Sequence, residues 1–283
     1  MALGTNHVTG TTIANWRPQI WAADVLAARE SNLVLAPLVR RYDRDIASKG
    51  QTVEIPNLSN LEAHAKVANT QVTLNGPTET KTTINIDQHW TSAVNVEDFA
   101  DAQSAYDTHS EYRKKTGYAI AEKIDNFVAE DMTENFTQEV GVFETAITYD
   151  VTLEAKLKLD VAKAPLTERY FVVTPQGHQD LLKVNEFTRY DAMGASSQPS
   201  PFKNGRVGHI LGADVYMSQN LDGASLYFHK EAYALAVQKT PKTEMQRKTE
   251  FLADLIVTQA LWGGTVLRED HGVRVLDSGS TSS

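Results

Sequence analysis

The chain has 283 residues, of which 41% are hydrophobic and 22% charged, enough to bury the core of one large or two modest domains. Its 27 basic and 36 acidic residues give a net charge of −9, which argues against a surface that holds nucleic acid through its phosphates. The chain has no cysteine, so it has no disulfide or thiolate chemistry, and no stretch resembles a signal peptide or a membrane helix.

The first 47 residues predict a helix and an extended segment. Asn15 is placed to cap a short helix with Pro18 in its first turn, and Trp21 lies on the apolar face of that helix. The apolar run 33–39 is broken by Pro37, which favours an extended segment lying on a surface. Mixed charges follow at 40–45, and we expect them to be solvated or paired.

The next feature is a long hairpin. Two strand-like runs, 51–56 and 82–87, flank the polar stretch 57–81, which has too few apolar residues to bury a core. A hairpin of this length gains little support from its own chain, so we expect it to lie against a neighbouring subunit.

One unusually long helix follows a short strand at 90–96. Residues 98–137 contain no proline and one glycine, and their apolar side chains recur at helical spacing behind Asp98, a plausible cap. A helix of that length would span about 55 to 60 Å. A projecting arm and an oversized helix favour a subunit built to join others over a compact enzyme.

The remaining chain alternates helices and strands, which predicts an α+β protein. The pattern predicts helices from 150 or 152 to 161 and over 175–183, strands at 169–173, 207–210, 213–217 and 226–228, and a loop at 193–201. Residues 232–237 fit a strand or a short helix, and 245–251 are ambiguous. Strands at 255–261, 265–268 and 273–276 are separated by Gly263, Gly264 and Gly272, which we interpret as turn residues.

Candidate chemistry is sparse. His178 and Asp180 stand two residues apart and permit a hydrolase hypothesis, but no G-x-S-x-G nucleophile motif accompanies them. Acidic residues at 98, 101, 130, 131 and 134 match no calcium-loop pattern, and no phosphate-binding glycine motif occurs. We therefore predict no catalytic residue, cofactor or metal, with a soluble α+β hydrolase as the alternative from another class.

Six segments in order resemble one protein family. They are WRPQIWAADVLAARESNLVLAPLVRR, KGQTVEIPNLSN, TTINIDQHWTSAVNVEDFADAQ, RYFVVTPQGHQDLLK, GRVGHILGADVYMSQNL and FHKEAYALAVQ. Their order along the chain resembles that of the major capsid proteins of tailed bacteriophages, which share the Hong Kong 97 fold.

The resemblance implies a division of the chain. Residues 1–47 would be an N-terminal arm, 48–87 the extended E-loop hairpin, and 88–139 with 241–276 a peripheral domain that carries the spine helix 98–137. Residues 140–240 would form the axial domain, and 277–283 a flexible tail. Such subunits assemble into pentamers and hexamers that form an icosahedral head around phage DNA, so the expected location is the virion, after assembly in the host cytoplasm.

The resemblance also implies partners and contact residues. The chain begins close to the arm, so we expect any scaffold to be a separate protein, alongside portal and decoration proteins. Some relatives link a lysine of this loop covalently to a neighbour, and Lys66 lies near the loop tip, although an exposed lysine is usually only solvated. The predicted intersubunit residues are Trp16, Trp21, Arg40, Arg41, Glu54, Lys66 and Lys81. An encapsulin-type nanocompartment shell is the alternative within the same fold.

Overall fold

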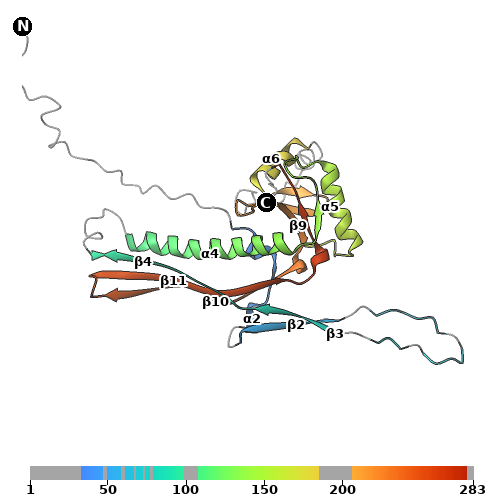
Figure 1. Ribbon diagram of the computed structural model, residues 1–283, viewed down its shortest axis with the longest axis horizontal. Coiled ribbons are helices and arrows are strands. Elements are labelled where there is room, and N and C mark those ends of the chain that lie inside the picture. The colour runs from blue at the N-terminus through green and yellow to red at the C-terminus, as the bar shows by residue number, and fades with distance from the viewer. Residues whose placement is uncertain are drawn as a thin grey trace, which may run out of the picture.

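A computed structural model describes residues 33–46, 50–58, 61–66, 68–72, 74–76, 79–98, 108–184 and 206–278. These residues form three sheets, of two, four and six strands, and one long helix, from which the two-stranded sheet is separated by the four-stranded one (Figure 1). This helix, α4 (Thr108–Asn135), has 28 residues and is therefore about 42 Å long. No helix in this part of the chain is long and apolar enough to cross a membrane.

The four-stranded sheet lies along α4 and has the order β1-β10-β11-β4. Its strands are β1 (Arg40–Arg41), β10 (Tyr233–Lys248), β11 (Ala253–Val266) and β4 (Gln88–Glu97). Buried residues alternate along β11, as expected when one sheet face packs against a helix. Thr258 of that face donates its hydroxyl to Thr116 of α4 at 2.9 Å, a buried hydrogen bond that links the sheet to the helix.

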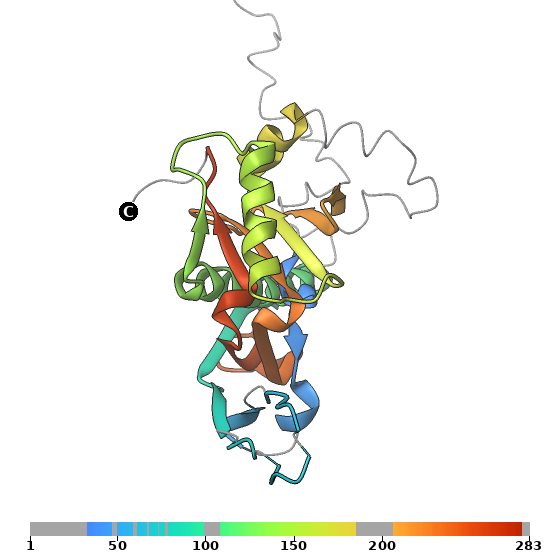
Figure 2. The ribbon, with the colours of Figure 1, turned by 90° about the vertical axis from the view of Figure 1, so that its right-hand side faces the viewer.

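The six-stranded sheet lies at the C-terminal end of α4, as Figure 2 shows from a second direction. Its order is β5 (Gln138–Val140), β12 (Gly272–Val275), β9 (Ser225–His229), β6 (Arg169–Val173), β8 (Ala213–Met217) and β7 (Arg206–Ile210). Helices α5 (Tyr149–Val161) and α6 (Pro175–Lys183) share a core with one face of this sheet. Thr148 and Thr174 cap these helices through their hydroxyls.

The largest core joins both sheets through α4. Ile124, Val128 and Met132 of the helix belong to one buried cluster with Phe228 of the six-stranded sheet and Trp262 of the four-stranded sheet. The helix therefore serves as a common support, and its C-terminal half fixes the two sheets relative to each other. The short helices α1 (Leu35–Leu38) and α2 (Asp43–Ile46) lie beside this support and the base of β10.

Two expectations about strands were wrong, and one segment left ambiguous is now assigned. Residues 253–266 form one continuous strand through Gly263 and Gly264, which are not turn residues. Residues 245–251, whose structure the sequence left ambiguous, form the end of β10 and the turn after it, since β10 pairs with β11 from Tyr233 to Lys248. Residues 272–275 join the six-stranded sheet and not the sheet that packs along the spine helix.

Two terminal segments also differ from expectation. The run 33–39 is not wholly extended, because residues 35–38 form one helical turn in which Pro37 gives up an N–H that a first turn does not use. The expected flexible tail is fixed at its start, where the fully buried carboxylate of Asp277 accepts hydrogen bonds from Thr174 and Ser225, both at 2.7 Å.

The long helix is confirmed over 108–135, and residues 99–107 lie outside the described residues. Asp98, expected as its cap, uses its carboxylate for an ion pair with Arg247 of β10. The predicted helix after Asn15 and the loop 193–201 also lie outside the described residues.

Candidate assembly surfaces

The clearest candidate surface is the hairpin of β2 (Thr52–Leu58) and β3 (Glu79–Asn85), which projects from the rest of the molecule (Figure 1). The two strands pair from Thr52 with Asn85 to Leu58 with Glu79. Among the described residues of the hairpin, only those at its base belong to a hydrophobic core. There Ile84 and Ile86 pack against Ala234 and Ala236 of β10. Beyond the base most residues of both strands are exposed, as the sequence predicts for an arm that lies against another subunit.

Two polar contacts join the limbs of the hairpin tip, whose described residues contain no strand. The side chain of Asn75 donates to the carbonyl of Glu62 at 2.7 Å and lies 2.8 Å from Nε2 of His64, so it joins the two limbs. Around this clasp three apolar side chains point into solvent: Leu61, Val72 and Leu74 are 67%, 60% and 82% exposed. Large exposed apolar groups on a projecting loop indicate a contact surface.

The predicted contact residues of the hairpin are paired within the chain. Lys81 donates to Glu54 at 2.6 Å across the two strands, and more than half of each side chain is exposed. Lys66 donates to the carbonyl of Thr70 within the tip. These bonds leave Glu54, Lys66 and Lys81 on the surface, where a neighbouring subunit could still contact them. Their intersubunit roles stay predictions.

The other predicted residues lie in the N-terminal segment. Arg40 forms a 2.6 Å ion pair with Glu231 and lies over the ring of Tyr42, and Arg41 pairs with Asp43 at 2.8 Å. Their charges are matched, as expected for 40–45, and their contacts with other subunits stay predictions. Trp16 and Trp21 lie outside the described residues.

A buried carboxylate fixes this N-terminal segment to the spine helix. Asp125 of α4 is fully buried and accepts hydrogen bonds from the backbone N–H groups of Val34 (3.3 Å) and Ala36 (2.9 Å). It also accepts one from the side-chain amide of Asn220 at 3.0 Å. The Asp125 side chain thus caps α1 and joins the N-terminal segment to α4 and to the loop after β8.

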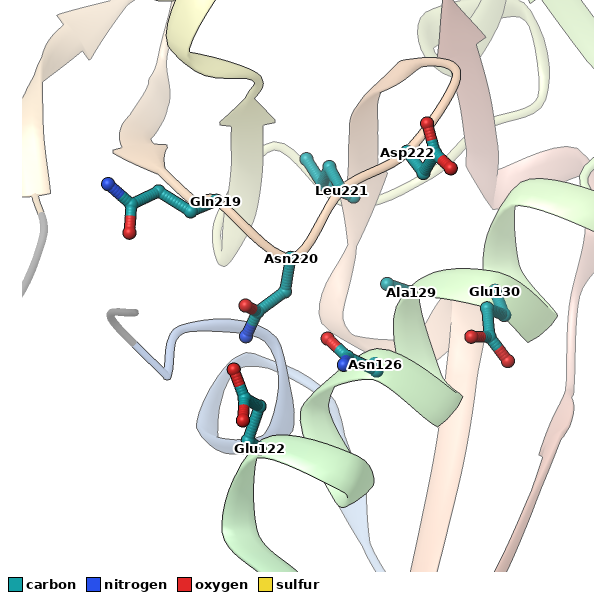
Figure 3. Close-up of a pocket in the computed structure, with 8 residues that line it drawn as sticks. All are labelled: Glu122, Asn126, Ala129, Glu130, Gln219, Asn220, Leu221 and Asp222. Carbon is teal, nitrogen blue, oxygen red and sulfur yellow. The ribbon is translucent and has the colours of Figure 1, made fainter. Parts of the chain in front are cut away.

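Beside this junction lies a polar pocket of about 510 Å³ (Figure 3). Glu122, Asn126 and Glu130, one helical turn apart on α4, face the loop that carries Asn220 and Asp222. The lining is acidic, but the described part of the chain has no group of three or more residues arranged to hold a metal ion.

A second apolar surface was missed from the sequence. Leu153, Leu157 and Val161 are 39%, 59% and 73% exposed at successive turns of α5, while Ala155 and Leu159 are buried. The sequence did contain a sign of this exposed face. Apolar residues lie on two different faces of the helix predicted to end at 161, and one sheet can cover only one of these faces.

The hydrolase pair does not come together as a catalytic site. Asp180 is buried and accepts from Lys183 (3.0 Å) and Ser278 (2.6 Å), so its carboxylate anchors the C-terminal end of the described chain. Nε2 of His178 has no hydrogen-bond partner within the described residues, and burial lowers the pKa of this imidazole. Asp180 therefore does not orient His178 as a general base requires.

The comparisons with known proteins now decide the family. The model of a family described as phage capsid protein matches residues 32–278, which is most of the chain. The chain belongs to the phage capsid protein family. No curated protein matches it.

Solved capsid structures show the same fold. A chain of Mycobacterium phage Che8 is 25% identical, covers 94% of this capsid protein and 99% of its own length, and has a TM-score of 0.76. The capsid structure of cyanophage P-SCSP1u is 19% identical, with coverage of 99% and 97% and a TM-score of 0.78. The capsid of Ralstonia phage GP4 is 10% identical, with coverage of 97% on both sides and a TM-score of 0.73.

These matches confirm the Hong Kong 97-type α+β fold. They also confirm that the chain is a major capsid protein of a tailed phage, which forms the icosahedral head. Its family and structural neighbours are structural proteins of the virion. Neither the nanocompartment shell nor the hydrolase finds support in them.

Proposed function

We propose that the capsid protein assembles into pentamers and hexamers through its projecting hairpin, which reaches across an adjacent copy as an E-loop. The observation that carries this proposal is the hairpin tip, where Leu61, Val72 and Leu74 are exposed and no other described residue of the tip is buried. Burying the three side chains against a neighbour removes apolar surface from water, and each fully buried side chain contributes about 1.5 to 3 kcal/mol.

The sheets suggest the other roles. The four-stranded sheet with α4 would be the peripheral domain, and the six-stranded sheet with α5 and α6 the axial domain that surrounds the symmetry axes. This division would revise the boundaries 140–240 and 241–276 given above. The axial domain would gain residues 138–140 and 272–275, and the peripheral domain would gain 233–240. Residues 1–47 would be the arm that contacts a neighbour.

The shell would enclose DNA without binding a specific sequence, because a net charge of −9 does not favour tight phosphate binding. Scaffold, portal and decoration proteins would be separate partners, and assembly would take place in the host cytoplasm. No step of assembly requires the chain to act as an enzyme.

The test is assembly of the purified, untagged chain, with and without candidate scaffold proteins, followed by light scattering and negative-stain microscopy. We expect rings or closed shells. Leu74→Asp should prevent them, because it places a charge in the apolar contact, while leaving the circular dichroism and melting temperature of the subunit unchanged.

Gln71→Asp is the matched control, since it adds the same charge to an exposed position of the same tip. It should assemble like the unmodified chain. Normal assembly of Leu74→Asp would remove the tip from the mechanism, and a chain that stays monomeric with every candidate scaffold would refute the proposal as a whole.

A further inference from the structure

Two short 3₁₀ turns carry the chain between its two larger sheets. The first, η3 (Lys230–Ala232), connects β9 of the six-stranded sheet to β10 of the four-stranded sheet. The second, η4 (Glu269–His271), lies where the chain returns from β11 to β12. The backbone N–H groups of Leu267 and Arg268 both donate to the carbonyl of Ala232, at 2.8 and 3.2 Å. The two turns are thus bound together in one joint.

Each turn has a buried histidine at the joint. His229 and His271 are 3% and 4% exposed, and their rings meet edge to face with centroids 6.0 Å apart. Nδ1 of His229 accepts a hydrogen bond from the N–H of Glu231 at 3.2 Å and so caps η3. Nδ1 can accept only while it carries no proton. Nδ1 of His271 is buried and has no hydrogen-bond partner within the described residues.

The charges that face the pair are nearly balanced. They come from η3, from the start of β6, and from η4 with the residue before it, and are Glu231, Glu168, Arg169, Arg268 and Asp270. At the C-terminal end of α5, a hydrogen bond with the backbone of Ala162 acts in the opposite sense to burial and favours the protonated form of His271.

Three of these charges already have other partners, since Glu231 pairs with Arg40, Glu168 with Lys230, and Arg169 with Asp160. Asp270 remains 4.0 Å from Nε2 of His271, at the limit of an ion pair. Burial therefore dominates, and it lowers the pKa of both imidazoles. The mutual repulsion of the two rings adds to this for His229.

We propose that His229 and His271 make the joint between the two sheets acid-sensitive. A proton on Nδ1 of His229 removes the cap of η3, and a proton on either ring places a charge on an imidazole that is almost completely buried between the turns. The two sheets are then coupled less tightly at about pH 5.5 than at about pH 7.5, the interval in which an ordinary histidine gains its proton.

Hydrogen exchange of the purified full-length protein tests this, after correction for the pH dependence of chemical exchange. Peptides that cover 228–233 and 266–273 should lose protection at about pH 5.5, by up to about tenfold per histidine for each pH unit below the ordinary pKa of an imidazole. Residues 171–173 in the centre of the six-stranded sheet should keep their protection. Equal corrected protection of the joint at both pH values would overturn the proposal without any variant.

Variants assign the effect to the pair. His271→Gln and His229→Gln, tested separately in case one does not fold, should each reduce the acid-dependent loss at the joint. His178→Gln is the matched control, because His178 is another histidine whose pKa burial lowers but lies on α6. The joint of this control should remain acid-sensitive. If it lost that sensitivity, or if both joint variants kept the full effect, the pair would not be the cause.

Discussion

Replacing Asp125 by alanine should detach the N-terminal segment from the spine helix. The carboxylate is fully buried and accepts three hydrogen bonds, two from the backbone of Val34 and Ala36 and one from Asn220. Its removal leaves those three donors without an acceptor. An unsatisfied buried donor costs about 1 to 3 kcal/mol, but the change also removes the cost of burying a charge, so we expect a net loss of about 2 to 4 kcal/mol.

Urea unfolding of the dissociated subunit, followed by circular dichroism, measures this loss. Glu130→Ala is the control on the same helix, because the Glu130 side chain is 64% exposed and lies 4.0 Å from Lys123, and it should change stability by less than about 0.5 kcal/mol. Trypsin adds a local readout, since a detached segment should be cut faster at Arg40 and Arg41. If Asp125→Ala is no more destabilising than Glu130→Ala and no more sensitive to trypsin, the anchor has been assigned wrongly.

Three further changes test other parts of the subunit. Gly263→Ala should destabilise the subunit by about 2 kcal/mol or more in thermal melting, because the new methyl carbon would lie 1.8 Å from the carbonyl oxygen of Asn85. The control Gly117→Ala on α4 meets no atom within 4 Å and should be neutral or stabilising in the same experiment. Glu54→Gln should change stability by less than about 1 kcal/mol, since the ion pair with Lys81 is largely exposed; a larger loss in urea unfolding would show that the pair holds the hairpin together. Burial lowers the pKa of His178 in the folded chain. The contribution of the neutral imidazole to the free energy of unfolding is therefore complete above an ordinary histidine pKa of about 6.5 and declines as the pH falls below it. His178→Gln should make the free energy of unfolding less dependent on pH in that range, and an unchanged slope would contradict this.

The elements that the sequence predicted well are those whose cause is local. Apolar spacing predicted α4, and two short runs predicted β2 and β3, since helix period and strand alternation depend on neighbouring residues. The predicted helix starts at 150 or 152 and at 175 lie close to the observed starts of α5 and α6, although the prediction did not name the threonines that cap them. The projecting hairpin was visible because its polar limb residues could not form a core.

The errors come from contacts between distant segments. Gly263 and Gly264 lie inside β11 because the base of the hairpin and the ring of Tyr233 approach the strand too closely for a side chain. A glycine that makes room for another segment looks the same in the sequence as a glycine that makes a turn. The partners of Asp277 lie more than 50 residues away, so the tail offered no sign of its anchor.

Exposed apolar surfaces are subject to the same limit. A pattern shows that a face is apolar, but it does not show how much of that face the chain itself will cover. Leu157 and Leu159 are equally apolar in the sequence, and only the folded sheet shows that Leu159 is buried while Leu157 is 59% exposed. A candidate contact surface is therefore an apolar pattern that remains after the chain's own core is complete, and the hairpin was predicted to lie against a neighbour because its polar residues could not form a core.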